Sequence, residues 1–291
     1  MTDLCGIELA HPVINASGCY DALAARAVFG DALTQQFPFS AYVSKTVTLA
    51  PRAGNPPPRL WETASGMINS IGLPNPGIDA YLEHHLAEYA QLGVPLITNV
   101  MGSSEEEFAL LVERVGERAE VAAIELNVSC PNVATGLDIG ADPDGVRALL
   151  GCLRPLTAKP LIVKLTPNTI DVAACALAAQ EAGADAVSLI NTLRAMALAP
   201  GSSEPWLGGR TGGLSGPAIR AVALAQVAAV AARVSIPIVG MGGVASGADA
   251  AALLGAGASV VAVGTESFRD PAAGRRIANE LAEIFAENAA W

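Results

Sequence analysis

The sequence predicts an α/β fold: a single (β/α)₈ (TIM) barrel that spans residues 1–291 and carries long lid or binding loops. Eight short apolar runs rich in β-branched residues recur along the chain, and helical patterns separate them. Apolar residues make up 52% of the chain and aromatic residues only 4%, which suits parallel strands buried on both faces. A doubly wound open sheet would show the same alternation, so periodicity alone leaves it as the alternative.

The predicted strands are short apolar runs, each bounded by turn or polar residues. In chain order we expect them at Val13–Ala16, Ala41–Val47, Pro95–Met101, Ala123–Ser129, Pro160–Thr166, Ala186–Thr192, Pro237–Gly242 and Val260–Thr265.

The predicted helices fill the intervals between these strands. Asp142-Pro143 is a typical helix start, and Gly183 and Gly255 follow predicted helix ends. We expect the helices at Asp21–Leu33, which has the weakest pattern, and at Pro76–Leu92, Ser104–Arg118, Pro143–Leu153, Thr169–Ala182, Pro217–Val234, Ser246–Leu254 and Pro271–Ala286.

Two long segments show no helical or strand periodicity. They are Leu49–Asn75, which is dense in Pro and Gly, and Leu193–Leu214. Loops of this length in a compact domain usually cover or bind a ligand. We therefore expect both segments to act as lids or binding loops.

Charge and cysteine content exclude several classes of protein. The net charge is −11 and the sequence pI is about 4.7, so neither nucleic acid nor an anionic membrane surface is an expected partner. The chain has five cysteines and none has the Cys-x-x-Cys spacing, which argues against a disulfide framework, a metal site or an iron–sulfur cluster within it. The N-terminus has no signal-peptide pattern, and we expect a cytoplasmic protein.

Polar residues or glycines recur at the end of nearly every predicted strand. A barrel enzyme carries its chemistry at the carboxyl ends of its strands. Any one such residue could be a satisfied strand cap, but burying so many polar groups together without a ligand is unfavourable. The register consists of Asn15-Ala16-Ser17-Gly18, Ser44-Lys45-Thr46, Asn99, Asn127, Lys164, Asn191-Thr192, Gly242-Gly243 and Gly264-Thr265.

The last two strand ends predict a phosphate site. Gly242-Gly243 and Gly264-Thr265 free backbone N–H groups for close approach to an anion, although these glycines could also serve tight turns alone. The run Gly240–Ala245 also matches the G-x-G-x-x-A dinucleotide fingerprint. Too little chain follows it for a Rossmann half-domain and its partner, so we reject that interpretation.

Cys130 lies just beyond the fourth predicted strand, before Pro131. A single cysteine is most often a small buried apolar residue, but on a loop its thiol could act as nucleophile or base. The three histidines are His11, His84 and His85, and none is at a predicted strand end. A catalytic Ser–His or Cys–His pair is therefore not expected.

The segment Asn127–Asn132, with the sequence Asn-Val-Ser-Cys-Pro-Asn, resembles a class 1 dihydroorotate dehydrogenase. The resemblance covers essentially the whole chain, and its motifs occur in the family's order. They include Asn15–Cys19, Lys45–Thr48, Pro51–Pro56, Glu62–Leu73, Lys164–Asn168, Ile190–Thr192, Thr211–Gly216 and Gly240–Gly243.

The resemblance implies an FMN enzyme that oxidises (S)-dihydroorotate to orotate in pyrimidine (UMP) biosynthesis. Cys130 would remove the C5 proton while hydride passes from C6 to flavin N5, and Lys45 would be the second catalytic residue. FMN would be bound by Ala16, Ser17, Lys45, Thr46, Asn99, Asn127, Lys164, Ile190, Gly216, Gly242, Gly243, Gly264 and Thr265. The substrate would be bound by Lys45, Asn69, Ser70, Ile71, Gly72, Leu73, Asn127, Asn132, Asn191 and Thr192.

The segments Asn132–Pro143 and Thr192–Gly216 resemble the NAD-linked subgroup B more than the fumarate-using subgroup A. Leu137 departs from the pattern, because a second glycine often follows Gly136. Subgroup B implies a homodimer of catalytic subunits and a partner subunit that carries FAD and a [2Fe–2S] cluster. The alternatives are a flavin enzyme like the pyrimidine-reducing domain of dihydropyrimidine dehydrogenases, and a non-catalytic flavin-binding barrel.

Overall fold

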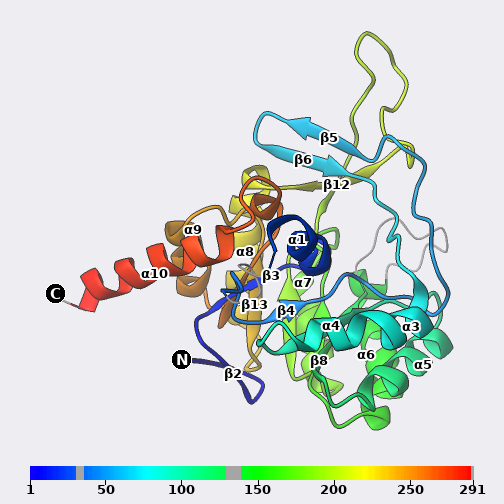
Figure 1. Cartoon of the computed structure of the whole chain (residues 1–291), viewed down its shortest axis with the longest axis vertical. Coiled ribbons are helices and arrows are strands. Elements are labelled where there is room, and N and C mark those ends of the chain that lie inside the picture. The colour runs from blue at the N-terminus through cyan, green and yellow to red at the C-terminus, as the bar shows by residue number, and fades with distance from the viewer. Residues whose placement is uncertain (31–35, 129–138, 290–291) are drawn as a thin grey trace.

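The core of the computed structural model is a barrel of parallel strands; the structure describes residues 1–30, 36–128 and 139–289 (Figure 1). Within these ranges eight strands follow one another around the barrel in the order β3-β14-β13-β10-β9-β8-β7-β4. Their bounds are β3 Val13–Asn15, β4 Tyr42–Val43, β7 Leu96–Val100, β8 Val121–Asn127, β9 Leu161–Lys164, β10 Ala186–Leu189, β13 Ile238–Met241 and β14 Val260–Val263.

The barrel closes between β3 and β4 through a side chain. The Asn15 amide donates from Nδ2 to the Val43 carbonyl at 2.7 Å, and its Oδ1 accepts the Val43 N–H at 2.8 Å. Asn15 is completely buried, so its amide takes the place of a peptide group in a strand ladder. The sheet is therefore closed, and the open doubly wound alternative is wrong. Asn15 belongs to the predicted polar register, but its amide closes the barrel.

Helices form the outer layer, and most begin where the sequence predicts. Side-chain caps at Asp21, Ser104, Asp142, Asp171 and Ser246 accept the first free N–H groups of five of them. The helices are α1 Ala22–Phe29, α3 Gly77–Ala80, a π-helical turn Tyr81–His85, α4 Leu86–Ala90, α5 Glu105–Gly116, α6 Pro143–Leu153, α7 Val172–Glu181, α8 Arg220–Ala231, α9 Gly247–Gly255 and α10 Ala273–Ala289. Short 3₁₀ turns lie at Ile139–Ala141, Arg154–Leu156, Pro217–Ile219 and Thr265–Phe268.

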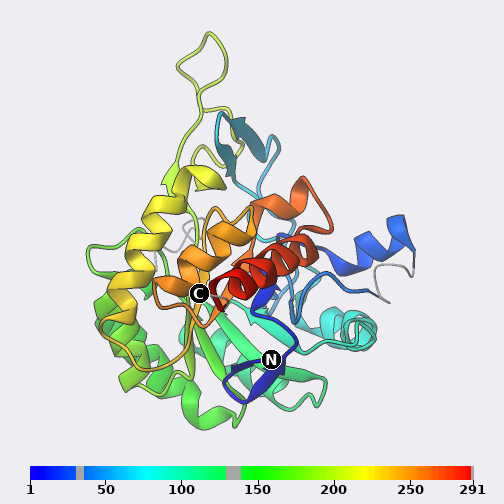
Figure 2. The same ribbon diagram turned by 90° about the vertical axis from the view of Figure 1, so that its left-hand side faces the viewer.

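An N-terminal hairpin covers one end of the barrel. Strands β1 (Thr2–Leu4) and β2 (Ile7–Leu9) pair antiparallel, and Leu4 and Leu9 are buried in the same apolar cluster as Ile14, Ile97 and Ile162. Figure 2 shows this dark blue hairpin at the opposite end of the molecule from the sheet that contains β5 and β6. One end of the barrel is thus closed by apolar side chains, which leaves the other for the polar strand ends.

The two long segments predicted as irregular contain strands, and this part of the prediction is wrong. The first supplies β5 (Leu60–Thr63) and β6 (Gly66–Asn69), and the second supplies β11 (Leu193–Ala195) and most of β12 (Gly212–Ser215). They form one antiparallel sheet in the order β11-β12-β6-β5. We call these four strands the lid sheet.

The lid sheet has a small apolar core of its own. Ile68, Ala197 and Leu207 are buried in it. The rings of Trp61 and Trp206 meet edge to face with centroids 5.3 Å apart. Tertiary burial, not local periodicity, therefore holds these short strands together.

The helices of the described residues include no candidate membrane span.

Candidate functional site

Polar side chains are buried at the carboxyl ends of neighbouring barrel strands. Asn127 at the end of β8 pairs in register with Lys164 at the end of β9, and Asn99 on β7 pairs with Glu125 on β8. Strands in adjacent ladder positions lie about 4.8 Å apart. The exposed fractions of these residues are 0% for Asn99, 4% for Glu125, 6% for Asn127 and 5% for Lys164. Asn99, Asn127 and Lys164 are thus buried near one another at the same end of the barrel, as their positions at strand ends predict.

A buried carboxylate organises the polar cluster. Glu125 accepts one hydrogen bond from Asn99 Nδ2 at 2.5 Å and another from the Ser188 hydroxyl at 2.7 Å. Because an ionised carboxylate only accepts, the Asn99 amide must turn its nitrogen to Glu125 and its oxygen the other way. Asn99 Oδ1 is buried and has no hydrogen-bond partner among the described residues. An unpaired buried acceptor of this kind is typical of a site for a ligand with an N–H group.

Two of the three lysines in the chain lie at this end of the barrel. Lys45 follows β4 and Lys164 ends β9, whereas Lys159 precedes β9 and donates to the Val121 carbonyl at 2.7 Å. Burial raises the pKa of the Cys19 thiol, and the charges of Lys164 and Lys45 act in the opposite direction. Both ammonium groups therefore lie near the Cys19 sulfur, and together they make this end of the barrel locally cationic.

Burial also sets the charge state of Lys45. It lowers the pKa of the ammonium group, the nearby Asp21 and Cys19 act against this, and Arg59 adds to it. A half-buried cation is incompletely compensated by its surroundings, so an anionic ligand would stabilise it. Thr46, next in the chain, is 3% exposed, and its hydroxyl accepts from Asn127 Nδ2 at 3.4 Å.

The first strand end is tied to its neighbours by hydroxyl groups. Ala16 is 6% exposed, and the Ser17 hydroxyl donates to the Ser44 carbonyl at 2.8 Å. The Ser44 hydroxyl accepts the backbone N–H of Asn99 at 3.1 Å. These bonds fix the carboxyl ends of β3, β4 and β7 relative to one another.

Three glycine-bearing segments meet next to the last strand ends. A Cβ built on Gly216 would lie 3.4 Å from Thr265 Cγ2, and one built on Gly243 would lie 2.9 Å from the Gly216 carbonyl oxygen. Gly216, Gly242 and Gly243 have positive φ angles of 89°, 129° and 77°, which favour glycine. Met241 ends a barrel strand that pairs with β10 and β14, consistent with rejecting a Rossmann fingerprint here.

The predicted substrate residues on the lid segment form a tightly bonded turn. The Ser70 hydroxyl accepts from Asn55 Nδ2 at 3.0 Å, and the Asn55 N–H donates to the Ile71 carbonyl at 3.0 Å. Gly72 and Leu73 both have positive φ, 75° and 54°. Side chains of this turn are therefore partly engaged within the turn itself.

Asn69 is bonded within the lid sheet, and Thr192, just after β10, contacts that sheet from the barrel side. Asn69 Nδ2 donates to the Gly213 carbonyl at 3.2 Å in the lid sheet. The side chain of Thr192 packs against Gly213, where an added Cβ would lie 1.9 Å from its hydroxyl.

Asn191 and Ile190 follow β10. Asn191 Oδ1 accepts the backbone N–H of Thr192 at 3.0 Å. Ile190 is 2% exposed, and its N–H donates to the Met241 carbonyl at 2.9 Å.

Two of the predicted site residues, Cys130 and Asn132, lie outside the described residues. The structure also adds residues that sequence reasoning missed as site residues, namely Glu125, Ser188 and Cys19. Glu125 carried the clearest signal, because it is an acidic residue inside the apolar run Ala123–Ser129. An unpaired carboxylate in a buried strand is unfavourable, so its position predicts polar partners on the adjacent strands.

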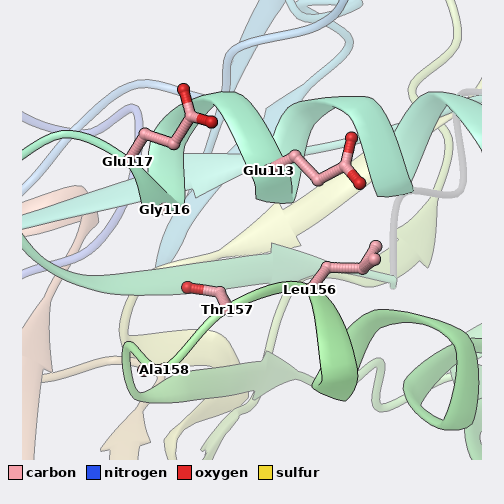
Figure 3. A pocket seen from close by; sticks show the side chains of 6 residues that line it. All are labelled: Glu113, Gly116, Glu117, Leu156, Thr157 and Ala158. Atoms are coloured by element: carbon pink, nitrogen blue, oxygen red, sulfur yellow. The ribbon is translucent and has the colours of Figure 1, made fainter.

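A hollow of about 490 Å³ lies at the other end of the strands (Figure 3). Its lining comes from the last turns of α5 and the segment that precedes β9, and includes Glu113, Glu117, Leu156 and Thr157. These segments lead into the amino ends of β8 and β9, opposite Asn127 and Lys164. Its two carboxylates would repel an anionic ligand, so we do not assign the site to this hollow.

Comparisons with known proteins identify the family. The family model described as dihydroorotate dehydrogenase matches residues 1–285. A protein of Geobacter metallireducens named "Dihydroorotate dehydrogenase B (NAD(+)), catalytic subunit" is 43% identical over 290 residues, 98% of this chain and 93% of that protein. A protein of Pelobacter propionicus with the same name is 45% identical over 280 residues, 96% and 91% of the two chains.

The fold is also that of a solved structure described as DHODH from Eimeria tenella in complex with ferulenol. The TM-score is 0.82 at 24% identity, with 100% of this chain and 85% of that chain covered, which is informative for the fold alone. The family model and the full-length relatives settle the assignment at the level of sequence. The chain belongs to the dihydroorotate dehydrogenase family.

Proposed function

We propose that this chain is the catalytic subunit of an NAD⁺-linked dihydroorotate dehydrogenase, which oxidises (S)-dihydroorotate to orotate in pyrimidine biosynthesis. The observation that carries the proposal is the buried cluster of Asn99, Asn127 and Lys164 at the carboxyl end of the barrel. Asparagine amides offer both donors and acceptors, which match the amide edge of a dihydropyrimidine. The names of its full-length relatives support the same reaction.

The described residues fit FMN as the cofactor. The unpaired Asn99 Oδ1 is an acceptor for a ring N–H group, and Lys164 offers a cation on β9, separated from Asn99 by strand β8. The glycine segments at Gly216 and Gly243 permit close approach of a phosphate to backbone N–H groups. When bound, FMN supplies the group that accepts hydride from substrate C6.

The family resemblance implies more cofactor contacts than the residues just described. We propose that FMN is held by Ala16, Ser17, Lys45, Thr46, Asn99, Asn127, Lys164, Ile190, Gly216, Gly242, Gly243, Gly264 and Thr265. We propose that the substrate is held by Lys45, Asn69, Ser70, Ile71, Gly72, Leu73, Asn127, Asn132, Asn191 and Thr192.

Cys130 is the proposed base that takes the C5 proton, and Lys45 is the proposed partner of the substrate carboxylate. A free thiol has a pKa of about 8.5, so the thiolate is a minority species at neutral pH. Activity should therefore rise with pH through the alkaline range. A half-buried ammonium at Lys45 suits an anionic substrate, because each charge compensates the other.

The proposal includes a second type of subunit. The name "catalytic subunit" is that of the relatives, and it supports a partner that passes electrons to NAD⁺. Among the described ranges there is no group of three or more His, Cys, Asp or Glu side chains that could hold a metal ion. We propose that the partner carries the FAD and the [2Fe–2S] cluster. A homodimer of catalytic subunits and a cytoplasmic location are part of the same proposal.

The test is anaerobic addition of dihydroorotate to the purified chain, with flavin absorbance as the readout. Loss of the oxidised-flavin band with formation of orotate is the expected result. Flavin that binds but is never bleached would contradict the proposed reaction and favour a non-catalytic flavin-binding barrel. Reoxidation of the reduced flavin by uracil or thymine, with no turnover of dihydroorotate, would favour the pyrimidine-reducing alternative.

A variant separates the proposed base from the cofactor site. Cys130→Ser should retain bound flavin while its reduction by dihydroorotate slows by about 100-fold or more, as expected when a positioned base is lost. Cys152→Ser is the matched control, because Cys152 is an exposed cysteine on α6. Equal rates of flavin reduction in Cys130→Ser and the control would remove Cys130 from the mechanism.

A further inference from the structure

Two arginines outside the proposed cofactor contacts tie together the three segments that carry Gly216, Gly243 and Thr265. Arg220 begins α8, directly after the turn that follows Gly216, and Arg276 lies in the first turns of α10. Their side-chain bonds reach the loop between β13 and α9 and the 3₁₀ turn after β14. We call residues 242–246 the β13 loop.

Arg220 fixes the first half of the β13 loop. Its Nε donates to the Gly243 carbonyl at 3.0 Å, and its Nη1 lies 2.9 Å from Asp249 Oδ1. The other oxygen of Asp249 accepts the Ala245 N–H at 3.0 Å. The Arg220–Asp249 pair thus holds one carbonyl and one N–H group of the same short loop.

Arg276 fixes the second half and connects it to the neighbouring segment. Its Nη1 donates to the Ala245 carbonyl at 3.1 Å, and its Nη2 donates to Glu266, next to Thr265, at 3.0 Å. Asp270 accepts a hydrogen bond from its Nε at 3.0 Å, and Glu280 accepts one from its Nη1 at 3.1 Å. One guanidinium therefore spans the β13 loop and the turn after β14.

These contacts determine the direction of a backbone N–H group. The Gly243–Val244 peptide is trans, because the cis peptide bonds of the described chain are at Pro57–Pro58 and Leu189–Ile190. In a planar trans peptide the carbonyl and the N–H point in opposite directions. Since the Gly243 carbonyl points to Arg220 in the outer helix layer, the Val244 N–H points away from that layer, toward the barrel.

The arginines themselves are poorly placed to bind an anion. Four carboxylates, from Asp249, Glu266, Asp270 and Glu280, accept ion pairs from the two guanidinium groups. The local charge of the network is therefore negative, and a second anion would gain little from direct contact with it. The role that remains is to orient backbone.

We propose that Arg220 and Arg276 are positioning residues for a phosphate monoester: they hold the Gly243 and Ala245 carbonyls of the β13 loop outward, so that the Val244 N–H faces the phosphate. The inference rests on the proposed FMN site and assigns it a basis for preferring a phosphorylated flavin. It predicts that loss of either arginine weakens binding of the phosphate and leaves binding of the ring system unchanged.

The test compares FMN with riboflavin, which differ only in the phosphate. The full chain, freed of flavin, is titrated with each ligand, and flavin fluorescence gives the two Kd values. Arg276→Gln and Arg220→Gln should each reduce the preference for FMN over riboflavin by about tenfold, the effect of one misplaced charge-assisted hydrogen bond. Arg276→Lys should reduce it less, because the charge is kept but the planar fork is lost.

Arg147→Gln is the matched control. Arg147 also bonds two carboxylates, Asp144 and Glu181, but lies on α6 away from these loops, so its loss should not change the preference. Glu266→Gln and Asp249→Asn test the same network if an arginine variant does not fold.

Equal loss of FMN and riboflavin affinity in the arginine variants, or an unchanged preference, would overturn the inference. Equal affinity of the wild-type chain for both ligands would overturn the phosphate site itself. A wild-type chain that binds neither ligand would overturn the proposed function.

Discussion

The closure of the barrel by Asn15 makes a quantitative prediction. Asn15→Leu replaces the amide with an apolar group of similar size and leaves the Val43 N–H and carbonyl without their partners, which lie at 2.8 and 2.7 Å. Each buried polar group that loses its partner destabilises a protein by about 1–3 kcal/mol. The two together should lower the free energy of unfolding by about 2–6 kcal/mol, a large part of the roughly 5–15 kcal/mol of a typical domain.

Urea denaturation of the flavin-free chain measures this effect. The midpoint should fall while the slope stays constant, because the surface exposed on unfolding does not change. Asn15→Asp should lie between wild type and Asn15→Leu, since it keeps an acceptor for the Val43 N–H but loses the donor. Asn279→Ala is the control, because Asn279 is exposed on α10 and its loss should change stability by less than about 0.5 kcal/mol.

A change below about 1 kcal/mol in Asn15→Leu would refute the reasoning, because that is the smallest effect of one unpaired group. It would mean that β3 and β4 are held by contacts other than the Asn15 amide. The flanking bond from the Ser17 hydroxyl to the Ser44 carbonyl would then be the next candidate.

Three further predictions follow from buried polar groups. Lys45→Met should leave the free energy of unfolding at pH 7 equal or higher, because burial lowers the pKa of Lys45 and so disfavours its charged form. The KM for dihydroorotate should rise about tenfold or more, because the substrate carboxylate loses its cation. Glu125→Gln should lower stability by about 1–3 kcal/mol and weaken flavin retention, since Asn99 and Ser188 lose their carboxylate acceptor. Burial lowers the pKa of His11 below 6.5, so near and below that pH the unfolded chain binds a proton that the folded chain does not. The urea midpoint of the wild-type chain should therefore fall as the pH drops below 6.5. The midpoint of His11→Gln should fall less.

The barrel was predictable because its signals are local. Each apolar run is short, each following helix begins at a capping residue such as Ser104 or Asp142, and parallel strands need helical connections. Periodicity alone does not determine closure, since closure depends on a contact between Asn15 and Val43, which belong to different strand–helix units. For the same reason, periodicity left the open sheet as an alternative.

The lid sheet could not be predicted because its strands are stabilised by partners far away in sequence. Asn69 pairs with Gly213, and Trp61 packs on Trp206. Strands β11 and β12 have only three and four residues, and the two glycines of β12 are weak strand formers. Their pairing depends on burial of the Ile68 cluster, which exists only in the folded chain.

The site was partly predictable, by register. Asn127 and Lys164 are predicted to be neighbours because both end strands, and they pair in the structure. The supporting residues escaped the same reasoning: Glu125 lies inside a strand, and Arg276 is one of two adjacent arginines on α10 in the outer helix layer. Register locates groups that face a ligand, but it carries no information on groups that act through another residue.

The electrostatics of the barrel end explain how an acidic chain can serve an anionic substrate. At physiological ionic strength the Debye length is about 8 Å, so surface carboxylates beyond that distance are largely screened from the site. Lys45 and Lys164 are buried or half-buried, where screening by salt is weak. The local potential at this end of the barrel therefore depends on these two ammonium groups together with Glu125, Asp21 and Arg59, and not on the net charge of −11. Lysine suits these two positions, because its ammonium group is a compact point charge that fits among the buried side chains of the barrel end, where the planar guanidinium of arginine is larger.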